Sequence, residues 1–155
     1  MTRLRVGVNA RCLEEPETRG LSRYASCLLR ALSARTDVDL VLFGMAPPAP
    51  GHMHGVRAEV IVFGGHGTEW QDHALPARLS RERIDVFHAP ADRGLPWRRG
   101  CAQLVTVHDS YERAHWRELF RSWKQRAWYW KHELTNRMRA DAILTVSDTT
   151  ARDLV

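Results

Sequence analysis

The sequence has few of the features that would set it apart from ordinary globular proteins. It has only three cysteines, Cys12, Cys27 and Cys101, scattered over 155 residues. This excludes a disulfide framework or a cysteine-based zinc site, so we expect reduced thiols and place Cys27 in the core. No apolar run approaches the roughly 20 residues that a membrane span requires. The N-terminus also lacks a signal-peptide core, so we expect a cytoplasmic protein.

Several catalytic motifs are missing as well. The sequence contains no GxGxxG, HExxH or GxSxG segment and no paired cysteines. These absences argue against a dinucleotide cofactor, a zinc hydrolase and a serine hydrolase. His88, His108 and Asp109 follow strand-like segments, but no ligand motif supports a metal ion between them. We therefore predict neither a metal nor a cofactor.

The composition, with 44% hydrophobic and 26% charged residues, is that of a globular protein. The length suits one domain over residues 1–155. The net charge of +5 favours anionic partners. Arginines on a solvated surface explain the same charge, so the charge does not choose a partner, and nucleic acid is the less favoured one.

Short runs of β-branched residues alternate with segments of helical periodicity, which is the pattern of βαβ units and a mostly parallel sheet. The predicted strands span residues 3–10, 38–43, 60–63, 85–88, 103–108 and 142–146. The predicted helices span residues 20–35, 68–83, 111–139 and 147–155. Between them, residues 44–56 are rich in proline and glycine, which predicts an irregular surface loop.

Two predicted helices carry apolar stripes. In the first, the stripe that should face the sheet consists of Leu21, Tyr24, Leu28, Leu29 and Leu32. In segment 111–139 it consists of Trp116, Phe120, Trp123, Ala127, Trp130, Leu134 and Met138, with eight arginines and lysines beside it. That second stripe fits a crossover helix packed on the sheet. It also fits a basic amphipathic helix on an anionic membrane surface, so both interpretations stay open.

Ligands of open α/β sheets bind beyond the carboxyl ends of the strands. This rule selects residues 9–11, His88, His108, Asp109 and Ser147. Gly20 begins a predicted helix, where free backbone N–H groups and the helix dipole favour an anion. We therefore expect His88, Asp109 and Gly20 to contribute to a substrate-binding rim.

Six segments occur in an order that carries a family resemblance: VGVNAR, RGLSRYASCLLRAL, WQDHALPARL, DVFHAP, TVHD and TVSDTTARDLV. Together they resemble the N-terminal domain of the family 4 retaining glycosyltransferases of GT-B fold. The resemblance implies a Rossmann-like three-layer α/β/α domain that binds the acceptor. It also implies a C-terminal donor-binding domain, which these 155 residues do not include.

The resemblance assigns roles to individual residues. His108 matches the catalytic histidine that hydrogen-bonds the transferred sugar, and Asp109 follows it at the cleft rim. Gly20 matches a glycine close to the donor phosphates and the acceptor, and Ser22 matches a position that contacts the acceptor. Arg19 and Ser22 depart from the family's TGIGRY-type loop, which makes this loop less flexible and more polar.

The function implied by the resemblance is transfer of a sugar, with retention, from a nucleoside-diphosphate sugar to an acceptor hydroxyl. The chain would be the acceptor-binding half, inactive without its second domain, and able to dimerise through the exposed cleft face. Acceptor choice would lie in loops 11–20, 44–56, 64–68 and 89–101. Two alternatives stay open. One is a stand-alone α/β binding domain, and the other is a module that binds the inner membrane surface through segment 111–139.

Overall fold

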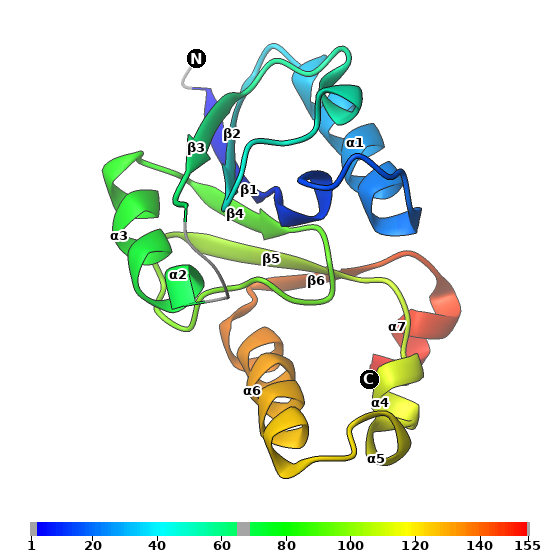
Figure 1. Ribbon diagram of the computed structural model, residues 1–155. Coiled ribbons are helices and arrows are strands. Elements are labelled where there is room, and N and C mark those ends of the chain that lie inside the picture. Colours follow the sequence, from blue (N-terminus) through cyan, green and yellow to red (C-terminus); the bar gives the residue numbers. More distant parts are fainter. Residues whose placement is uncertain (1–2, 65–68, 155) are drawn as a thin grey trace.

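The computed structural model describes residues 3–64 and 69–154. Six parallel strands form one sheet in the order β3-β2-β1-β4-β5-β6 (Figure 1). The strands are β1 Leu4–Asn9, β2 Val38–Gly44, β3 Glu59–Val62, β4 Val86–Ala89, β5 Ala102–Val107 and β6 Ala142–Thr145. All six lie where the sequence predicted strands. The Rossmann-like α/β fold is therefore confirmed.

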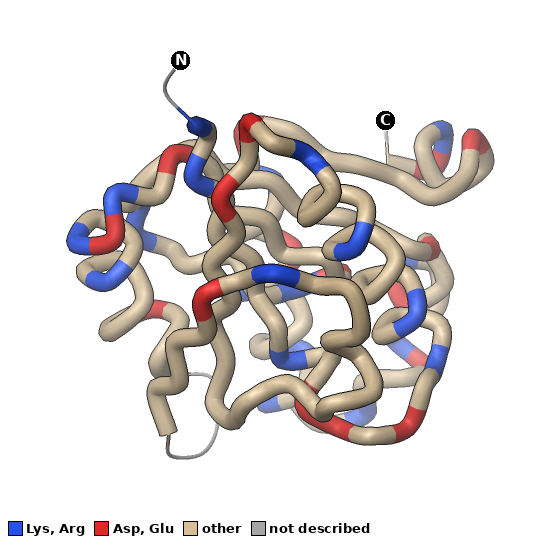
Figure 2. The backbone as a smooth tube through the Cα atoms, turned by 90° about the horizontal axis from the view of Figure 1, so that it is seen from above, with Lys and Arg blue, Asp and Glu red and all other residues tan. Residues whose placement is uncertain are grey.

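Helices connect the strands and flank the sheet (Figure 1). The α-helices are α1 Gly20–Ser33, α2 Glu69–Asp72, α3 Ala74–Arg81, α4 Tyr111–Ala114, α5 Trp116–Leu119, α6 Trp123–Arg139 and α7 Asp148–Leu154. Two 3-10 helices are η1 Arg11–Leu13 and η2 Pro50–Met53. Basic and acidic positions are interspersed along these elements (Figure 2), the pattern of a solvated surface.

Strand β2 shows how the sheet is covered on both faces. Leu40 and Leu42 join a buried cluster that contains Leu29 of α1. Val41, from the alternate set of positions, joins a second cluster that contains Leu75 of α3. Because successive side chains of a strand point to opposite faces, α1 and α3 must cover opposite faces of the sheet.

The predicted helix 68–83 is two helices, α2 and α3, separated at His73. Pro76 is the third residue of α3. Proline is tolerated in a first turn, because the N–H groups there have no partner within the helix. Pro76 thus lies near the start of a new helix, and the expected kink in a longer one is not present. The predicted cap Thr68 lies outside the described residues.

The predicted helix 111–139 is also wrong as one element, because the structure forms α4, α5 and α6 there. Helix α6 starts after Ser122, whose Oγ accepts a hydrogen bond from the Gln125 N–H at 3.3 Å. In return, Gln125 Oε1 accepts one from the Ser122 N–H at 3.0 Å. This capping box satisfies N–H groups that would otherwise lack partners, and so it sets the start of the helix.

Helix α6 does not bury the apolar stripe that the sequence suggested. Its buried residues are Tyr129, His132, Thr135 and Asn136. Met138 is 57% exposed and Trp123 is 74% exposed. Of the two interpretations left open for this stripe, packing against the sheet is therefore wrong.

Helix α1 also faces the protein differently from the prediction. Cys27, predicted to lie in the core, is exposed, and Leu21 is exposed as well. The buried face of α1 consists of Ser22, Ala25, Ser26, Leu29 and Ser33. Three of these five residues are serines, whose hydroxyls can form hydrogen bonds. The buried face of α1 therefore contacts polar groups of a loop as well as the apolar face of the sheet.

The polar partner comes from residues 44–56, where the structure forms η2 within the predicted irregular loop. His52 of η2 is buried, with its Nδ1 3.2 Å from Ser26 Oγ. Its Nε2 lies 2.9 Å from the Glu15 carbonyl oxygen. The imidazole therefore joins η2, α1 and the loop that precedes α1. Periodicity did not predict this element because its order comes from hydrogen bonds.

The two leucines of α1 provide a matched test of the packing. Leu29→Ala should lower the free energy of unfolding by about 2–5 kcal/mol, because Leu29 is fully buried. Leu21→Ala should change it by less than about 0.5 kcal/mol, because that side chain is exposed. Urea denaturation followed by circular dichroism measures both. Equal losses would contradict the orientation of α1.

Candidate functional site

Three pockets adjoin one another where β1, β4 and β5 end. The α1 pocket has a volume of about 580 Å³ and is lined by Arg11, Cys12, Glu15, Glu17, Arg19, Gly20, Leu21 and Ser22. The central pocket, of about 280 Å³, is lined by Asn9, Arg11, Cys12, Gln71, Pro90, Ala91, Arg93, Gly94, Trp128 and His132. Arg11 and Cys12 belong to both linings, so the two pockets meet there.

The α6 pocket, of about 240 Å³, lies on the other side of the central pocket. It is lined by Asp92, Arg93, Val107, Asp109, Ser110, Tyr111, Glu112, Arg113, Tyr129, His132, Glu133, Asn136 and Leu154. Arg93 and His132 line both this pocket and the central one. The three pockets together form a row at the point where the strand order reverses between β1 and β4. Ligands of open α/β sheets bind at such a point.

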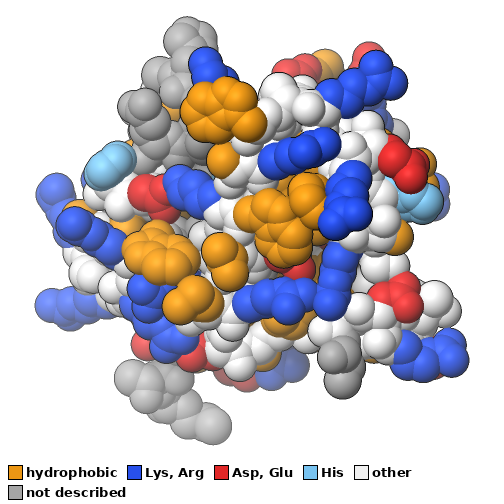
Figure 3. All heavy atoms as spheres, turned by 90° about the horizontal axis from the view of Figure 1, so that it is seen from below, with side chains coloured by type: hydrophobic (Ala, Val, Ile, Leu, Met, Phe, Trp, Pro, Cys, Tyr) orange, Lys and Arg blue, Asp and Glu red, His pale blue; other side chains and the backbone are white. Residues whose placement is uncertain are grey.

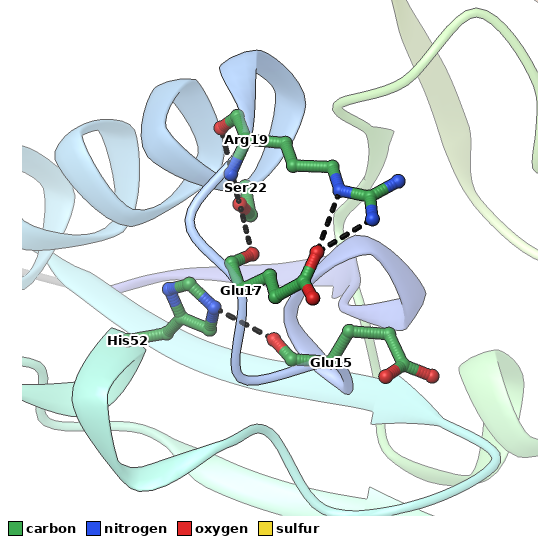
Figure 4. Close-up of polar contacts among 5 residues, drawn as sticks. All are labelled: Glu15, Glu17, Arg19, Ser22 and His52. Carbon is green, nitrogen blue, oxygen red and sulfur yellow. Dashed lines mark hydrogen bonds and ion pairs between the residues drawn. The ribbon is translucent and has the colours of Figure 1, made fainter.

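Gly20 and Ser22 both line the α1 pocket. Figure 4 shows Ser22 beside Arg19 and Glu17 at the start of α1. The Ser22 hydroxyl is already engaged, because its Oγ accepts a hydrogen bond from the Arg19 N–H at 2.9 Å. The Arg19 guanidinium pairs with the Glu17 carboxylate at 2.5 Å. At the N-terminus of α1, the negative charge of Glu17 therefore offsets the positive charge of Arg19.

His108 follows β5, and several bonds hold it in place. Its backbone N–H donates to Asp92 Oδ1 at 2.6 Å, and its Nε2 lies 2.8 Å from the Pro90 carbonyl oxygen. A carbonyl only accepts hydrogen bonds, so Nε2 is the donor in this contact and Nδ1 is the ring nitrogen left for another partner. The ring lies edge-on to Tyr24, with centroids 4.9 Å apart. His108 does not line the three pockets described.

His88 is buried beneath this rim. Its Nε2 lies 2.8 Å from Thr106 Oγ1, and the Tyr24 hydroxyl lies 3.1 Å from the same oxygen. Burial lowers the pKa of His88 to about 4, so the ring is neutral at pH 7. His88, Thr106 and Tyr24 thus form a buried hydrogen-bonded chain that ends against the ring of His108.

Asp109 lines the α6 pocket and is separate from Gly20 and Ser22. Its Oδ1 accepts a hydrogen bond from the Tyr111 N–H at 3.0 Å, at the start of α4. Within the described ranges 3–64 and 69–154, no three His, Cys, Asp or Glu side chains form a group that could hold a metal ion. The substrate-binding roles of Gly20, Ser22, His88 and Asp109 stay predictions.

The floor of the central pocket is formed by Asn9 at the end of β1, which is 6% exposed. Its Oδ1 accepts a hydrogen bond from the Arg11 N–H at 3.2 Å, and its Nδ2 donates to the Gly94 carbonyl at 3.3 Å. A Cβ atom at Gly94 would lie only 2.4 Å from Asn9 Nδ2, and the φ of Gly94 is +120°. Only glycine fits this close approach without strain.

Gln71 of α2 enters the central pocket from the side. The residue is 5% exposed. Its side-chain amide can both donate and accept a hydrogen bond, so it can pair with a polar ligand in the pocket.

Helix α6 forms the opposite wall with Trp128 and His132. The guanidinium of Arg93 lies 4.4 Å from the Trp128 ring centroid, and Arg93 also pairs with Glu112. His132 is 7% exposed, and its Nε2 has no hydrogen-bond partner among the described residues. Burial lowers the pKa of His132 to about 4, so this ring too is neutral at pH 7.

Cys12 also borders the central pocket. Burial raises the pKa of its thiol to about 11. The thiol therefore stays protonated near neutral pH, and the environment does not activate it as a nucleophile.

Seven central-pocket residues were not singled out individually by the sequence: Gln71, Pro90, Ala91, Arg93, Gly94, Trp128 and His132. Arg93 and Gly94 lie in loop 89–101, which was expected to influence acceptor choice. The statement on acceptor choice named that loop without choosing residues in it. Trp128 and His132 were missed because the helical stripe was assigned the wrong buried face.

A six-stranded parallel sheet with flanking helices, whose strand order reverses between β1 and β4, defines a Rossmann-like α/β domain. Residues 18–155 match the family Glycosyltransferase Family 4, which is more than half of the chain. The chain therefore belongs to glycosyltransferase family 4, as the resemblance implied. Comparisons with curated proteins and with solved structures gave no match. Among the described residues, no helix is long and apolar enough to cross a membrane.

The buried state of His88 predicts a pH dependence of stability. The pKa falls from 6.5 to about 4 on folding, so below pH 6.5 the unfolded chain binds a proton that the folded chain does not. The contribution of His88 to the free energy of unfolding is fully present above pH 6.5. This free energy should fall by up to about 1.4 kcal/mol per pH unit as the pH is lowered from 6.5 toward 4.

His88→Gln can still hydrogen-bond Thr106 but cannot titrate. The free energy of unfolding of this variant should therefore fall less than that of the parent protein across the same pH window. Urea denaturation at a series of pH values measures this, with His54→Gln at an exposed position as the matched control. Parallel pH profiles for the parent and His88→Gln would contradict the buried, neutral assignment.

Proposed function

We propose that this chain supplies the acceptor-binding wall of a retaining glycosyltransferase of GT-B fold. The enzyme would transfer a sugar from a nucleoside-diphosphate sugar to an acceptor hydroxyl. The observation that carries the proposal is the central pocket, whose neutral polar groups Asn9, Gln71 and His132 lie at the strand-order reversal. Membership of glycosyltransferase family 4 supports the reaction class.

In this proposal, His108 positions the transferred sugar. Its Nε2 is held by the Pro90 carbonyl, which leaves Nδ1 to accept a hydrogen bond from a sugar hydroxyl. Interactions that strengthen as charge develops in the transition state raise the rate, and those that are equally strong in the ground state do not. His108 therefore acts through hydrogen bonding, without being the base.

Other predicted residues have supporting roles in the proposal. Gly20 and Ser22 bind substrate in the α1 pocket, and Asp109 does so at the rim of the α6 pocket. His88 supports His108 from below through Thr106 and Tyr24. The mechanism uses no metal or cofactor, because the departing phosphate oxygen takes the acceptor proton.

The proposal also includes partners and location. A donor-binding domain, either in the same polypeptide or in a separate protein, supplies the groups that hold the nucleotide sugar. Residues 1–155 act as one domain, and the enzyme works in the cytoplasm. A dimer through the exposed cleft face remains part of the hypothesis.

The role of His108 is tested by assaying the full-length gene product against a panel of nucleoside-diphosphate sugars. His108→Ala should lower kcat about 100-fold or more, the usual cost of removing one transition-state hydrogen bond. His54→Ala, at an exposed position, should keep the parent activity. No transfer from any donor would favour the stand-alone binding domain, and an active His108→Ala variant would contradict the catalytic role.

A second candidate function is binding to an anionic membrane surface. The observation that favours it is the exposed stripe of α6, in which Trp123, Trp130 and Met138 lie beside basic residues. Seen from the side on which α5 and α6 lie, hydrophobic side chains alternate with Lys and Arg (Figure 3). Tryptophan at the interface and basic residues at the headgroups are typical of helices that lie on membranes.

Vesicle co-sedimentation tests this candidate. The protein should bind vesicles that contain anionic lipid more tightly than neutral vesicles, and salt should weaken the binding. Replacing Trp123 and Trp130 by Ala should lower the affinity about tenfold or more. Val60→Ala, an exposed apolar position on β3, serves as the control. Equal affinity for both vesicle types would contradict the candidate.

A further inference from the structure

We infer that the α6 pocket binds an uncharged sugar ring of the acceptor. This inference rests on the proposed function, because it names the class of acceptor and the groups that hold it. Two buried side chains of α6, Tyr129 and His132, line this pocket. The Tyr129 hydroxyl and the His132 Nε2 have no hydrogen-bond partner among the described residues. A ligand with hydroxyls would supply the partners that these two buried groups lack.

The surroundings of Tyr129 place its hydroxyl at the pocket. The ring stacks on Phe120, with centroids 4.9 Å apart. The charged side chains that act on the hydroxyl include Glu133, Arg113 and Arg93, and all three line the α6 pocket. Apolar contact therefore holds the ring, while the hydroxyl lies among the polar groups of the lining.

His132 brings a second hydrogen-bonding group to the same pocket. It lies three residues after Tyr129, so both side chains are on one face of the helix. Its ring meets Trp128 edge-on, with centroids 4.7 Å apart. His132 also lines the central pocket, so its ring lies where the two pockets meet. Packing therefore positions this ring, and its Nε2 has no competing partner among the described residues.

Both groups are uncharged at pH 7. Burial, together with the positive charges of Arg93 and Lys131, lowers the pKa of His132 to about 4. Burial, together with the negative charge of Glu133, raises the pKa of Tyr129. A phenol and a neutral imidazole can pair with sugar hydroxyls without the desolvation cost of a charge.

The carboxylates of the lining already have partners within the protein. Glu112 pairs with Arg93, and Glu133 pairs with Arg137 at 3.0 Å. Each of the two remaining carboxylates accepts a hydrogen bond from a backbone N–H. The lining has four carboxylates and two arginines, so an anionic ligand is disfavoured. An uncharged ligand leaves these pairs intact.

Position and volume both assign this ligand to the acceptor. Val107 and Asp109, the residues before and after His108, line the pocket. Asp92, another residue of the lining, accepts the hydrogen bond from the His108 N–H. At about 240 Å³, the pocket is below the range of about 300–1,000 Å³ for small-molecule sites. This volume suits one sugar ring and is too small for a nucleoside-diphosphate sugar.

Calorimetry with the protein tests the ligand class, using glucose, mannose and galactose as uncharged sugars. Glucuronate is the anionic counterpart, and N-acetylglycinamide is an uncharged ligand without a sugar ring. At least one hexose should bind at least about threefold more tightly than either comparison ligand, since one hydrogen bond contributes about that much. The inference is overturned if none of the three hexoses binds, or if either comparison ligand binds as tightly as the best hexose.

Tyr129→Phe removes only the hydroxyl and separates binding from stability. The affinity for the bound hexose should fall about threefold to tenfold, the usual effect of one lost hydrogen bond. The urea midpoint should not fall, because the hydroxyl has no partner in the free protein. Tyr24→Phe is the comparison for stability: it removes a hydroxyl 3.1 Å from Thr106 Oγ1 and should lower the midpoint. A lowered midpoint or an unchanged affinity in Tyr129→Phe contradicts the inference.

Trp123→Phe is the matched control for binding, because Trp123 is an exposed residue of α6 outside the described lining of the pocket. It should leave the affinity for the hexose unchanged. Transfer assays with the same sugars separate this inference from the proposed function. Hexose binding that depends on Tyr129, without transfer from any donor sugar, would support the pocket assignment and overturn the proposed function. Transfer to an acceptor whose KM is unchanged in Tyr129→Phe would support the proposed function and overturn the pocket assignment.

Discussion

The parallel pairing of β1 with both β2 and β4 is the constraint on which the rest of the structure depends. β1 lies next to β2 along its whole length and next to β4 through residues 6–8. The chain leaves β1 toward one edge of the sheet and later returns to extend the other edge. The loops after β1 and β4 therefore diverge, and the central pocket lies between them. Asn9, at the end of β1, becomes its floor.

Polar contacts, more than apolar ones, position the loops around this pocket. His52 joins η2 to Ser26 of α1 and to the loop at Glu15. His88 and Tyr24 meet at Thr106 beneath the rim. A buried hydrogen-bond network is directional, so it specifies one arrangement more sharply than apolar packing does. The serines on the buried face of α1 allow this arrangement.

The sequence predicted the sheet well and the site only in part, for physical reasons. Buried parallel strands are short, continuous apolar runs, and such runs are visible without knowledge of their neighbours. Helix limits depend on caps and on proline position, as Ser122 and Pro76 show. Apolar periodicity over 111–139 continued across two breaks and so predicted one helix with the wrong buried face. The pocket residues Gln71 and His132 are brought together only by tertiary packing.

Gly94 determines which parts of this pocket are free to vary. The space that a Cβ atom would need at this position is already occupied by the Asn9 amide. The contact between β1 and the 89–101 loop therefore behaves as a unit, and a change on either side displaces the other. Trp128 enters the pocket from α6 and lies outside this contact. The wall formed by α6 can thus change by substitution while the floor of the pocket stays fixed.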